Sequence, residues 1–273
     1  GGKRAPDHSR LASFIREHLK DGVLERLFYQ MVELLKEEGE ISAEHLFVDG
    51  TKIEANANRY SFVWAKSTSK YEARADEKRK LLLERLTVEY GIVADKPETY
   101  REALQERKRL GEINFVYSRG KRKTQLQRDM EELEELLARK AKYEGYRRTF
   151  KGRNSFSKTD PDATFMRMKE DHMKNGQLKP GYNLQLGVEG EYIVGAHICS
   201  ERSDELALLG LLERIETGCG IRHQNVVADA GYESGENYKR LESRGQAAYI
   251  KPQNYERLKT KKYRNNAYQI GRA

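Results

Sequence analysis

A long charged stretch without strand-like runs separates two regions that contain them. This order of predicted elements restricts the possible folds more than any other feature of the sequence. His45 to Ala55 reads as a strand, with Gly50-Thr51 as a tight turn or bulge inside it. From residue 56 to about 160 the charge rises and only helical patterns are readable. Strand signals return from Tyr182 to Val188 and from Tyr192 to Cys199, which predicts a β-hairpin.

The segment after this hairpin alternates helices and strands. The pattern predicts a helix from Asp204 to about Thr217, a strand from Asn225 to Asp229, a helix from Ser234 to about Arg244 and a strand from Ala247 to Ile250. A strand, a helical interruption, a hairpin and then alternating helices and strands is typical of α/β proteins with a mixed sheet. We therefore predict an α/β fold whose sheet is interrupted after its first strand.

Helical spacing also predicts the remaining elements. Near the N-terminus one helix begins after an Asp7 cap and runs to Lys20, and a second carries apolar residues from Val23 to Leu35. A helix-turn-helix and a plain helical hairpin that covers the sheet both fit this pair. In the insert we predict helices at about 68–90, 97–115 and 123–144, of which the last carries a heptad-like seam: Leu126, Met130, Leu133, Leu137 and Ala141. An antiparallel hairpin and an interaction arm fit that seam equally.

Positive charge is concentrated in the insert. The chain has 51 Lys and Arg against 43 Asp and Glu, a net charge of +8, and the stretch from Lys66 to Lys158 holds 25 basic and 16 acidic residues. This excess favours a surface that meets a polyanion, although a solvated helical face explains it too. The residues we select as DNA-binding candidates lie in the insert (Arg119, Lys121, Arg122, Lys123) and near the C-terminus (Lys251, Arg257, Lys259, Lys261, Lys262, Arg264).

Targeting signals are not found in the sequence. No apolar run approaches the ~18 residues that span a bilayer, and no signal-peptide pattern is present at the N-terminus. We therefore expect a soluble cytoplasmic protein with no membrane partner.

Two aspartates each follow a short apolar run, and they are the strongest candidates for chemistry. Asp49 follows Leu46-Phe47-Val48, and Asp229 follows Val226-Val227-Ala228, 180 residues further along the chain. A carboxylate at the end of a buried strand is costly unless it is paired or holds a metal. Two such carboxylates that converge on one edge of a sheet can hold divalent cations for phosphoryl transfer.

Three runs give the chain a resemblance to a known family. Phe47–Arg59, Lys179–Gln185 and Ala228–Tyr232 resemble bacterial insertion-sequence transposases of the DDE type, and the resemblance extends from Arg4 to the end of the chain. It implies a ribonuclease-H-like catalytic domain, with Asp49 and Asp229 as its first two catalytic acids and metal ligands. It also implies Mg²⁺, for which Mn²⁺ can substitute, and double-stranded DNA of element ends and targets as partner. A homo-oligomer assembled on DNA and a nucleoid location follow from the same likeness.

The resemblance also gives a domain division and an expectation about a third acid. The division is an N-terminal helical segment (1–44), the first strand of the catalytic domain (45–55), a basic helical insert (56–160) and the remainder of that domain (161–273). The family's third acid is a glutamate in a Tyr-x₂-Arg-x₃-Glu pattern. Only Tyr71 has an arginine at the required step, Arg74, and Lys78 stands in the glutamate position. We therefore expect the third acid beyond Ala273, in a chain truncated at both ends, and metal binding without efficient turnover.

Other functions stay open at this point. One alternative is a non-catalytic DNA-binding or assembly module derived from a transposase, in which the insert pairs with another copy. Another is a coiled-coil scaffold that makes no DNA contact. Asp160-Pro161-Asp162 is a further source of carboxylates, but Pro in a polar stretch favours a turn and a helix cap.

Overall fold

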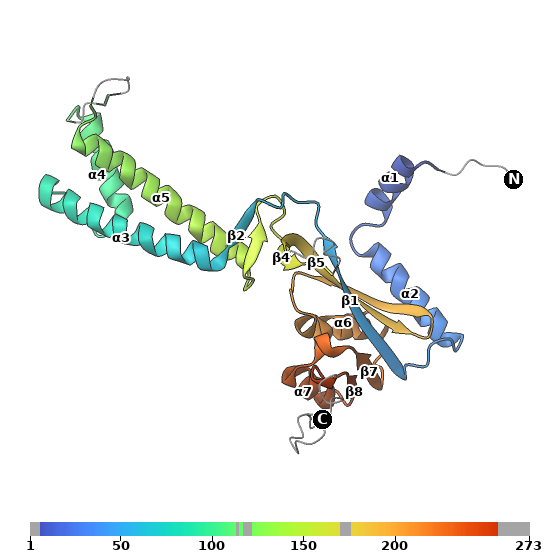
Figure 1. Ribbon diagram of the computed structural model, residues 1–273. Helices are drawn as coiled ribbons and strands as arrows, with labels where there is room; N and C mark the ends of the chain where they lie inside the picture. The colour runs from blue at the N-terminus through green and yellow to red at the C-terminus, as the bar shows by residue number, and fades with distance from the viewer. Residues whose placement is uncertain (1–5, 113–114, 117–121, 170–175, 256–273) are drawn as a thin grey trace, which may run out of the picture. The chain divides into compact units, whose positions relative to one another are not determined.

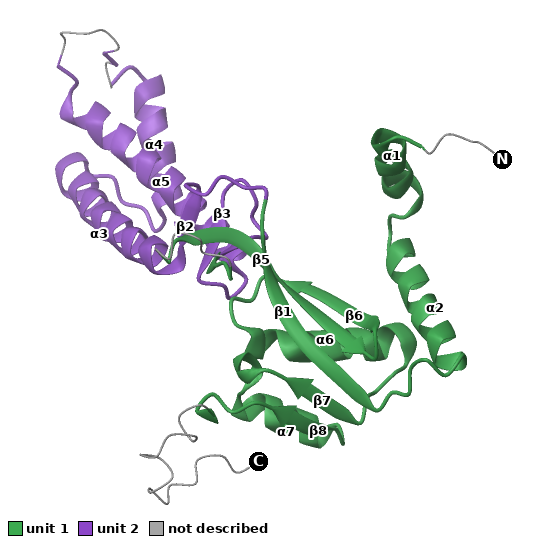
Figure 2. Ribbon diagram, turned by 45° about the vertical axis from the view of Figure 1, so that its right-hand side comes forward, with its two compact units in different colours: residues 1–55, 166–273 green, residues 56–165 purple. Residues whose placement is uncertain are grey.

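The computed structural model describes residues 6–112, 115–116, 122–169 and 176–255. The chain divides into two compact units, of which unit 1 comprises residues 1–55 and 166–273 and unit 2 comprises residues 56–165 (Figure 2). Among the described residues, no helix is both long and apolar enough to cross a membrane.

A six-stranded mixed sheet forms the framework of unit 1, and the α/β prediction is confirmed (Figure 1). The strand order is β4-β5-β1-β7-β8, with β6 paired to β5. β1 is antiparallel to β5 and parallel to β7, which is parallel to β8 in turn. The strands are β1 (His45–Glu54), β4 (Thr164–Arg167), β5 (Leu178–Glu189), β6 (Tyr192–Cys199), β7 (Asn225–Ala228) and β8 (Ala247–Ile250).

Helices cover one face of this sheet. The apolar face of α6 (Asp204–Cys219) packs on the inward side chains of β1, β6 and β7, and α7 (Gly235–Ser243) lies beside β8. α2 (Val23–Glu37) packs against α6 through Tyr29 and Val32. α1 (His8–His18) begins after the predicted Asp7 cap but buries none of its residues, so it adds nothing to the core.

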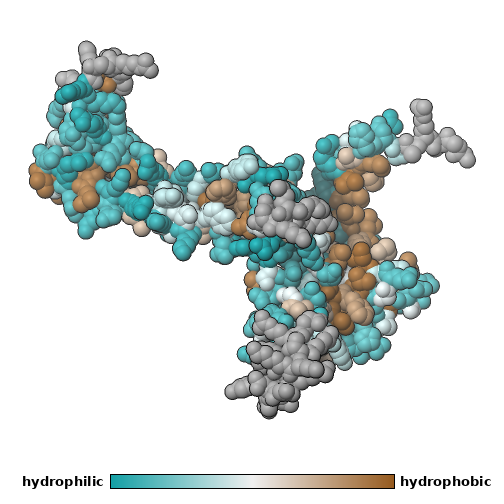
Figure 3. Space-filling model, viewed as in Figure 1, coloured by the Kyte–Doolittle hydropathy of each residue, from teal (hydrophilic) through white to brown (hydrophobic). Residues whose placement is uncertain are grey.

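Unit 1 leaves large apolar side chains exposed, and part of this apolar surface is visible in brown in Figure 3. They lie on α1 and α2 (Leu11, Phe14, Ile15, Leu24, Leu27, Met31, Leu34) and on the strands (Phe47, Ile53, Ile193, Ile198, Tyr249).

β1 is continuous, so the predicted turn or bulge at Gly50-Thr51 is wrong. The ladder between β1 and β5 runs without a break from Phe47↔Val188 to Glu54↔Gly181. Gly50 lies opposite Gln185, and a Cβ on Gly50 would stand only 2.3 Å from Gln185 Nε2. The glycine is therefore needed because the Gln185 side chain lies against the β1 backbone, and it does not mark a change of direction.

A buried polar cluster fixes the starts of β1 and β7. Glu189 accepts hydrogen bonds from the Ser42 backbone N–H (2.9 Å) and hydroxyl (2.7 Å), and its other oxygen lies 2.9 Å from His223 Nε2. The Gln224 N–H also donates to the Ala43 carbonyl oxygen at 3.1 Å. Ser42 precedes β1 and His223 precedes β7, so Glu189 joins the two loops from which the parallel strands begin.

Unit 2 is a helical hairpin whose two ends are joined by a short two-stranded sheet. β2 (Phe62–Trp64) pairs antiparallel with β3 (Ser155–Ser157), and between them lie α3 (Ala65–Tyr90), α4 (Pro97–Arg109) and α5 (Gln125–Phe150). α4 ends six residues before its predicted end, and α5 continues six residues beyond its own. Of the predicted seam, Met130 and Leu133 are buried, Leu126 and Leu137 are partly buried, and Ala141 is exposed.

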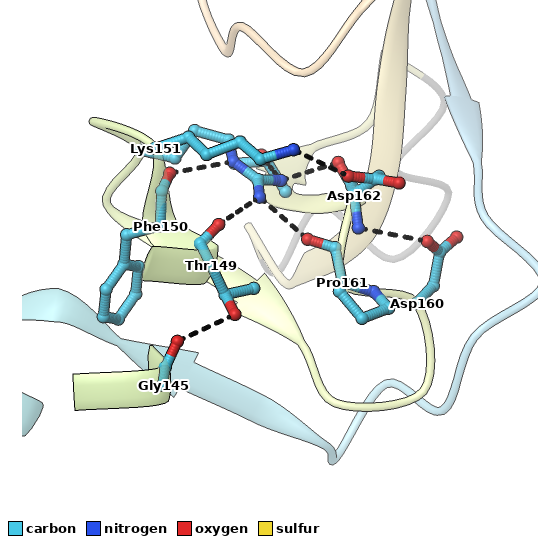
Figure 4. A network of polar contacts seen from close by, with 9 residues as sticks. Gly145, Thr149, Phe150, Lys151, Asp160, Pro161 and Asp162 are labelled. Atoms are coloured by element: carbon cyan, nitrogen blue, oxygen red, sulfur yellow. Dashed lines mark hydrogen bonds and ion pairs between the residues drawn. The ribbon is translucent and has the colours of Figure 1, made fainter. Parts of the chain in front are cut away.

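Two arginines stabilise unit 2 internally. Arg85 Nη2 lies 2.6 Å from Oδ1 of the fully buried Asp129, which joins α3 to α5. Arg153 donates to the carbonyl oxygens of Thr149 (2.7 Å), Pro161 (2.8 Å) and Asp162 (2.7 Å), and so links the end of α5 to the next turn (Figure 4). The Ala163 N–H donates to the Asp160 carbonyl oxygen at 3.1 Å, so the turn predicted there is confirmed. The predicted helix cap is wrong, because the strand β4 and not a helix follows this turn.

Candidate active site

Asp49 lies in the middle of β1, not at the end of the strand as expected. Its side chain is 82% exposed. Oδ1 accepts a hydrogen bond from the Gly50 backbone N–H at 2.8 Å. The sequence argument for a metal here assumed a buried carboxylate, which is costly unless it is paired. Because this carboxylate faces solvent, that cost does not apply. Asp49 is still an accessible oxygen donor for a ligand.

Asp229 follows β7 directly and caps the short 3₁₀ helix η1 (Ala230–Tyr232). Its Oδ1 accepts a hydrogen bond from the Gly231 N–H at 2.8 Å, and the residue is exposed. In both aspartates Oδ1 is held by a backbone N–H close in sequence. Each carboxylate therefore keeps its Oδ2 and a second lone pair on Oδ1 for a ligand.

The strand register brings the two aspartates together. The parallel ladder between β1 and β7 ends with the pair Val48↔Ala228, and the next residue on each strand is Asp49 and Asp229. Neighbouring strands lie about 4.8 Å apart, so the two residues stand side by side at one level of the sheet. Ligand sites in open α/β sheets lie at the carboxyl ends of parallel strands, which is where β7 ends.

Two lysines lie at this level as well. Lys169 Nζ is 3.6 Å from Asp49 Oδ1 and donates to the Gly50 carbonyl oxygen. Lys251 follows the pair Ala228↔Ile250 on β8, so it is the neighbour of Asp229, and its N–H donates to the Ala228 carbonyl oxygen at 3.1 Å. Lys251 is one of the DNA-binding candidates from the sequence, whereas Lys169 is not, because no sequence pattern distinguishes it from neighbouring charged residues such as Arg167 and Glu170.

A buried polar network lies on the inner face of the sheet beneath the aspartates. The Tyr232 hydroxyl donates to Gln185 Oε1, and Gln185 Nε2 donates to Asn183 Oδ1 at 2.8 Å. Both amides donate to Asp204 Oδ1, Asn183 at 2.8 Å and Gln185 at 3.2 Å. Burial raises the pKa of the Tyr232 phenol, and the nearby charges of Asp204, Asp49 and Asp229 raise it further. Sequence reasoning missed this network because its members lie on three separate elements.

One comparison with known proteins found a match, and it includes part of this site. Residues 153–272 match the family model described as a transposase DDE domain. Over this stretch, 120 of its 273 residues, the chain is similar to a transposase DDE domain. Searches of curated proteins and of solved structures each found no match.

The match covers only part of the candidate site. It includes Asp229, Asp204 and the network below them, while Asp49 precedes it. The register of β1 against β7 is therefore what places Asp49 beside the matched region. The mixed sheet is compatible with the ribonuclease-H-like fold that the resemblance implies.

The site offers a cation two carboxylates. Within the ranges that the structure describes, no three His, Cys, Asp or Glu side chains lie close enough together to hold a metal ion. Asp49 and Asp229 nevertheless suit Mg²⁺, which binds through one or two carboxylates and keeps several waters. DDE transposases in general use divalent metal ions, and this pair of exposed oxygens fits such an ion.

Most of the predicted DNA-binding residues fall outside the described part of the chain. These are Arg119, Lys121, Arg257, Lys259, Lys261, Lys262 and Arg264. Of the others, Arg122 is exposed, Lys123 Nζ lies 2.6 Å from Glu131 Oε2, and the Lys251 ammonium lies 5.2 Å from the ring centroid of Tyr255. Lys123 is thus already paired with a carboxylate of the same unit.

Proposed function

We propose that this chain is a DNA transposase in which Asp49 and Asp229 hold Mg²⁺, or Mn²⁺ in its place, for cleavage and transfer of DNA strands. The observation that carries the proposal is the register that sets these two exposed aspartates side by side on parallel strands. The match of residues 153–272 to a transposase DDE domain supports the same reaction class.

Each group at this edge of the sheet has a role in the proposal. Bound divalent cations supply Lewis-acid stabilisation of the charge that develops on phosphate oxygens during in-line displacement. Asp49 and Asp229 provide oxygen ligands whose orientation is fixed by backbone N–H groups. Lys169 and Lys251 provide positive charge where the phosphodiester of a DNA strand approaches, since both lie at the level of the aspartates.

Unit 2 presents a separate basic surface that suits the DNA backbone. Four exposed basic residues of α3 follow one another at four-residue steps, and together we call them the α3 stripe: Lys66, Lys70, Arg74 and Lys78. None of the four forms an ion pair with the part of the chain that the structure describes. Three acids lie in the same stretch, of which Glu72 and Asp76 pair with Arg147 and Arg79, and Glu77 is exposed. Twelve residues of helix span about 18 Å, a length over which one DNA strand presents about five phosphates. We propose that the α3 stripe holds double-stranded DNA.

Cation binding by aspartate variants tests the proposed chemistry. Titration of the protein with Mn²⁺ in a calorimeter is expected to show binding that Asp49→Asn and Asp229→Asn each weaken at least tenfold. Each substitution removes one of two charged ligands while it keeps the size of the side chain. Circular dichroism of the same variants checks that they fold.

Glu54→Gln is the matched control for Asp49→Asn. Glu54 is a carboxylate on the same strand, lies 2.6 Å from Lys179 Nζ and is remote from Asp229 in the register. We expect this variant to bind Mn²⁺ as the wild type does. If both aspartate variants keep wild-type Mn²⁺ affinity and DNA binding is indifferent to Mg²⁺, the chain is instead a non-catalytic DNA-binding or assembly module.

A further inference from the structure

Asp204 stands apart from the other acidic residues near the site because its position is determined by buried donors. It is the first residue of α6, half-buried, and its Oδ1 accepts from the amides of Asn183 and Gln185. Both amides are completely buried. Gln185 Nε2 is occupied as a donor, so its Oε1 must accept, and the Tyr232 hydroxyl must donate to it. The donors and acceptors of this network are therefore fixed, and Asp204 is its final acceptor.

The second oxygen of Asp204 faces the turn that carries Asp229. A Cβ placed on Gly231 would lie 3.3 Å from Asp204 Oδ2 and 3.0 Å from Asp229 Oδ1. The two carboxylates therefore flank the same backbone position, which is the Gly231 whose N–H is held by Asp229. A third negative charge is thus fixed next to the two that face solvent.

The charge of Asp204 affects the binding of any cation at Asp49 and Asp229. Asp204 and Asp229 flank Gly231, and Asp49 lies level with Asp229 on the neighbouring strand, so the three carboxylates lie in one region of unit 1. Burial raises the pKa of the Tyr232 phenol, and the charges of all three carboxylates raise it further. Like charges held close together repel, and a divalent cation beside them removes that repulsion. A fixed carboxylate next to a ligand pair therefore strengthens cation binding even where it makes no bond to the ion.

We infer that Asp204 is a positioning residue of the Asp49–Asp229 site: held by Asn183 and Gln185, it places a fixed negative charge beside Asp229 and so raises the affinity of the pair for a divalent cation. This inference rests on the proposed function of that pair. It assigns a role to the buried polar network, which otherwise places costly polar side chains in the core of unit 1. Asp204 acts through the field at the site and is not one of the cation's ligands.

Calorimetric titration with Mn²⁺ of the full chain at pH 7.5 tests the inference. Asp204→Asn keeps an oxygen for the two amides but removes the charge, and we expect the Kd for Mn²⁺ to rise about three- to tenfold. Glu205→Gln is the matched control, because Glu205 is the other acid in the first turn of α6. It lowers the charge at the same helix end and is expected to leave the Kd within twofold of the wild type.

The outcomes separate this inference from the proposed function. If Asp204→Asn leaves the Kd unchanged while Asp49→Asn weakens it, the positioning role is wrong and the proposed site stands. If Asp204→Asn abolishes binding as completely as Asp49→Asn does, Asp204 is a ligand and the positioning role is again wrong. If Asp49→Asn and Asp229→Asn have no effect, the proposed site itself fails. Thermal unfolding without added cation, which we expect to be similar for Asp204→Asn and Glu205→Gln, shows that both variants keep the fold.

Discussion

Glu189→Ala is expected to lower the free energy of unfolding of unit 1 by about 3–5 kcal/mol, because it removes the buried carboxylate that accepts two hydrogen bonds from Ser42 and pairs with His223. Glu189 and His223 are 6% and 2% exposed, and the carboxylate also receives two hydrogen bonds from Ser42. Its loss leaves the imidazole and the Ser42 donors without their acceptor. Urea unfolding followed by circular dichroism measures the change.

Glu191→Gln provides the control for this substitution. Glu191 is an exposed residue in the turn next to the cluster, so its replacement is expected to change the free energy of unfolding by less than about 0.5 kcal/mol. A loss below about 1 kcal/mol for Glu189→Ala would contradict the structural importance of the cluster.

The same cluster predicts sensitivity to acid. Burial lowers the pKa of His223, although the charge of Glu189 opposes this shift. Burial alone would raise the pKa of Glu189, but the hydrogen bonds from Ser42 and the charge of His223 outweigh it, and the net shift is downward. In both residues the unfolded chain binds protons more readily than the folded one. Stability is therefore full near pH 7–8, declines below about pH 6.5 as unfolded histidine takes up a proton, and declines further as Glu189 protonates.

Reversing charge on the α3 stripe is expected to weaken binding to double-stranded DNA on the order of 100-fold at about 0.1 M salt. The variant combines Lys66→Glu, Lys70→Glu and Lys78→Glu. Each lost phosphate contact also lowers the slope of log affinity against log salt by about 0.9. Fluorescence anisotropy of a labelled duplex over a series of salt concentrations measures both quantities.

A control with the same net charge separates a local surface from a general charge effect. It combines three exposed lysines that lie apart from one another: Lys36→Glu, Lys96→Glu and Lys239→Glu. We expect this variant to lose less than about threefold in affinity and to keep the wild-type salt slope. Equal losses in the two triple variants would mean that net charge, and not the α3 stripe, determines DNA binding.

The order of the elements could be predicted from the sequence because it depends on local patterns. β8 was predicted at its observed bounds, and the hairpin of β5 and β6 follows from alternation around Gly190, which has a φ of 62°. The course of β1 was mispredicted at Gly50, because glycine marks a turn in most sequences and here makes room for Gln185, a residue distant in the chain. The end of α5 was mispredicted for a similar reason, since packing against α3 extends this helix beyond its apolar seam.

The site was predictable only in part. The sequence indicated Asp49 and Asp229 as separate positions after apolar runs, but their pairing depends on the register of β1 against β7. That register depends in turn on Ser42, Glu189 and His223, which look unrelated along the chain. Lys169 and the Tyr232–Gln185–Asn183–Asp204 network have no local signal at all, because each member is an ordinary residue until the fold brings it to the others.

Iron-directed cleavage tests most directly whether Asp49 and Asp229 form one cation site. Fe²⁺ takes carboxylate ligands as Mg²⁺ does, and with ascorbate and peroxide it generates hydroxyl radicals that cut the backbone beside the bound ion. We predict cuts in the wild-type protein near both Asp49 and Asp229, and loss of both cuts together in Asp49→Asn and in Asp229→Asn. Cuts near only one aspartate, or cuts near one that survive substitution of the other, would contradict a shared site.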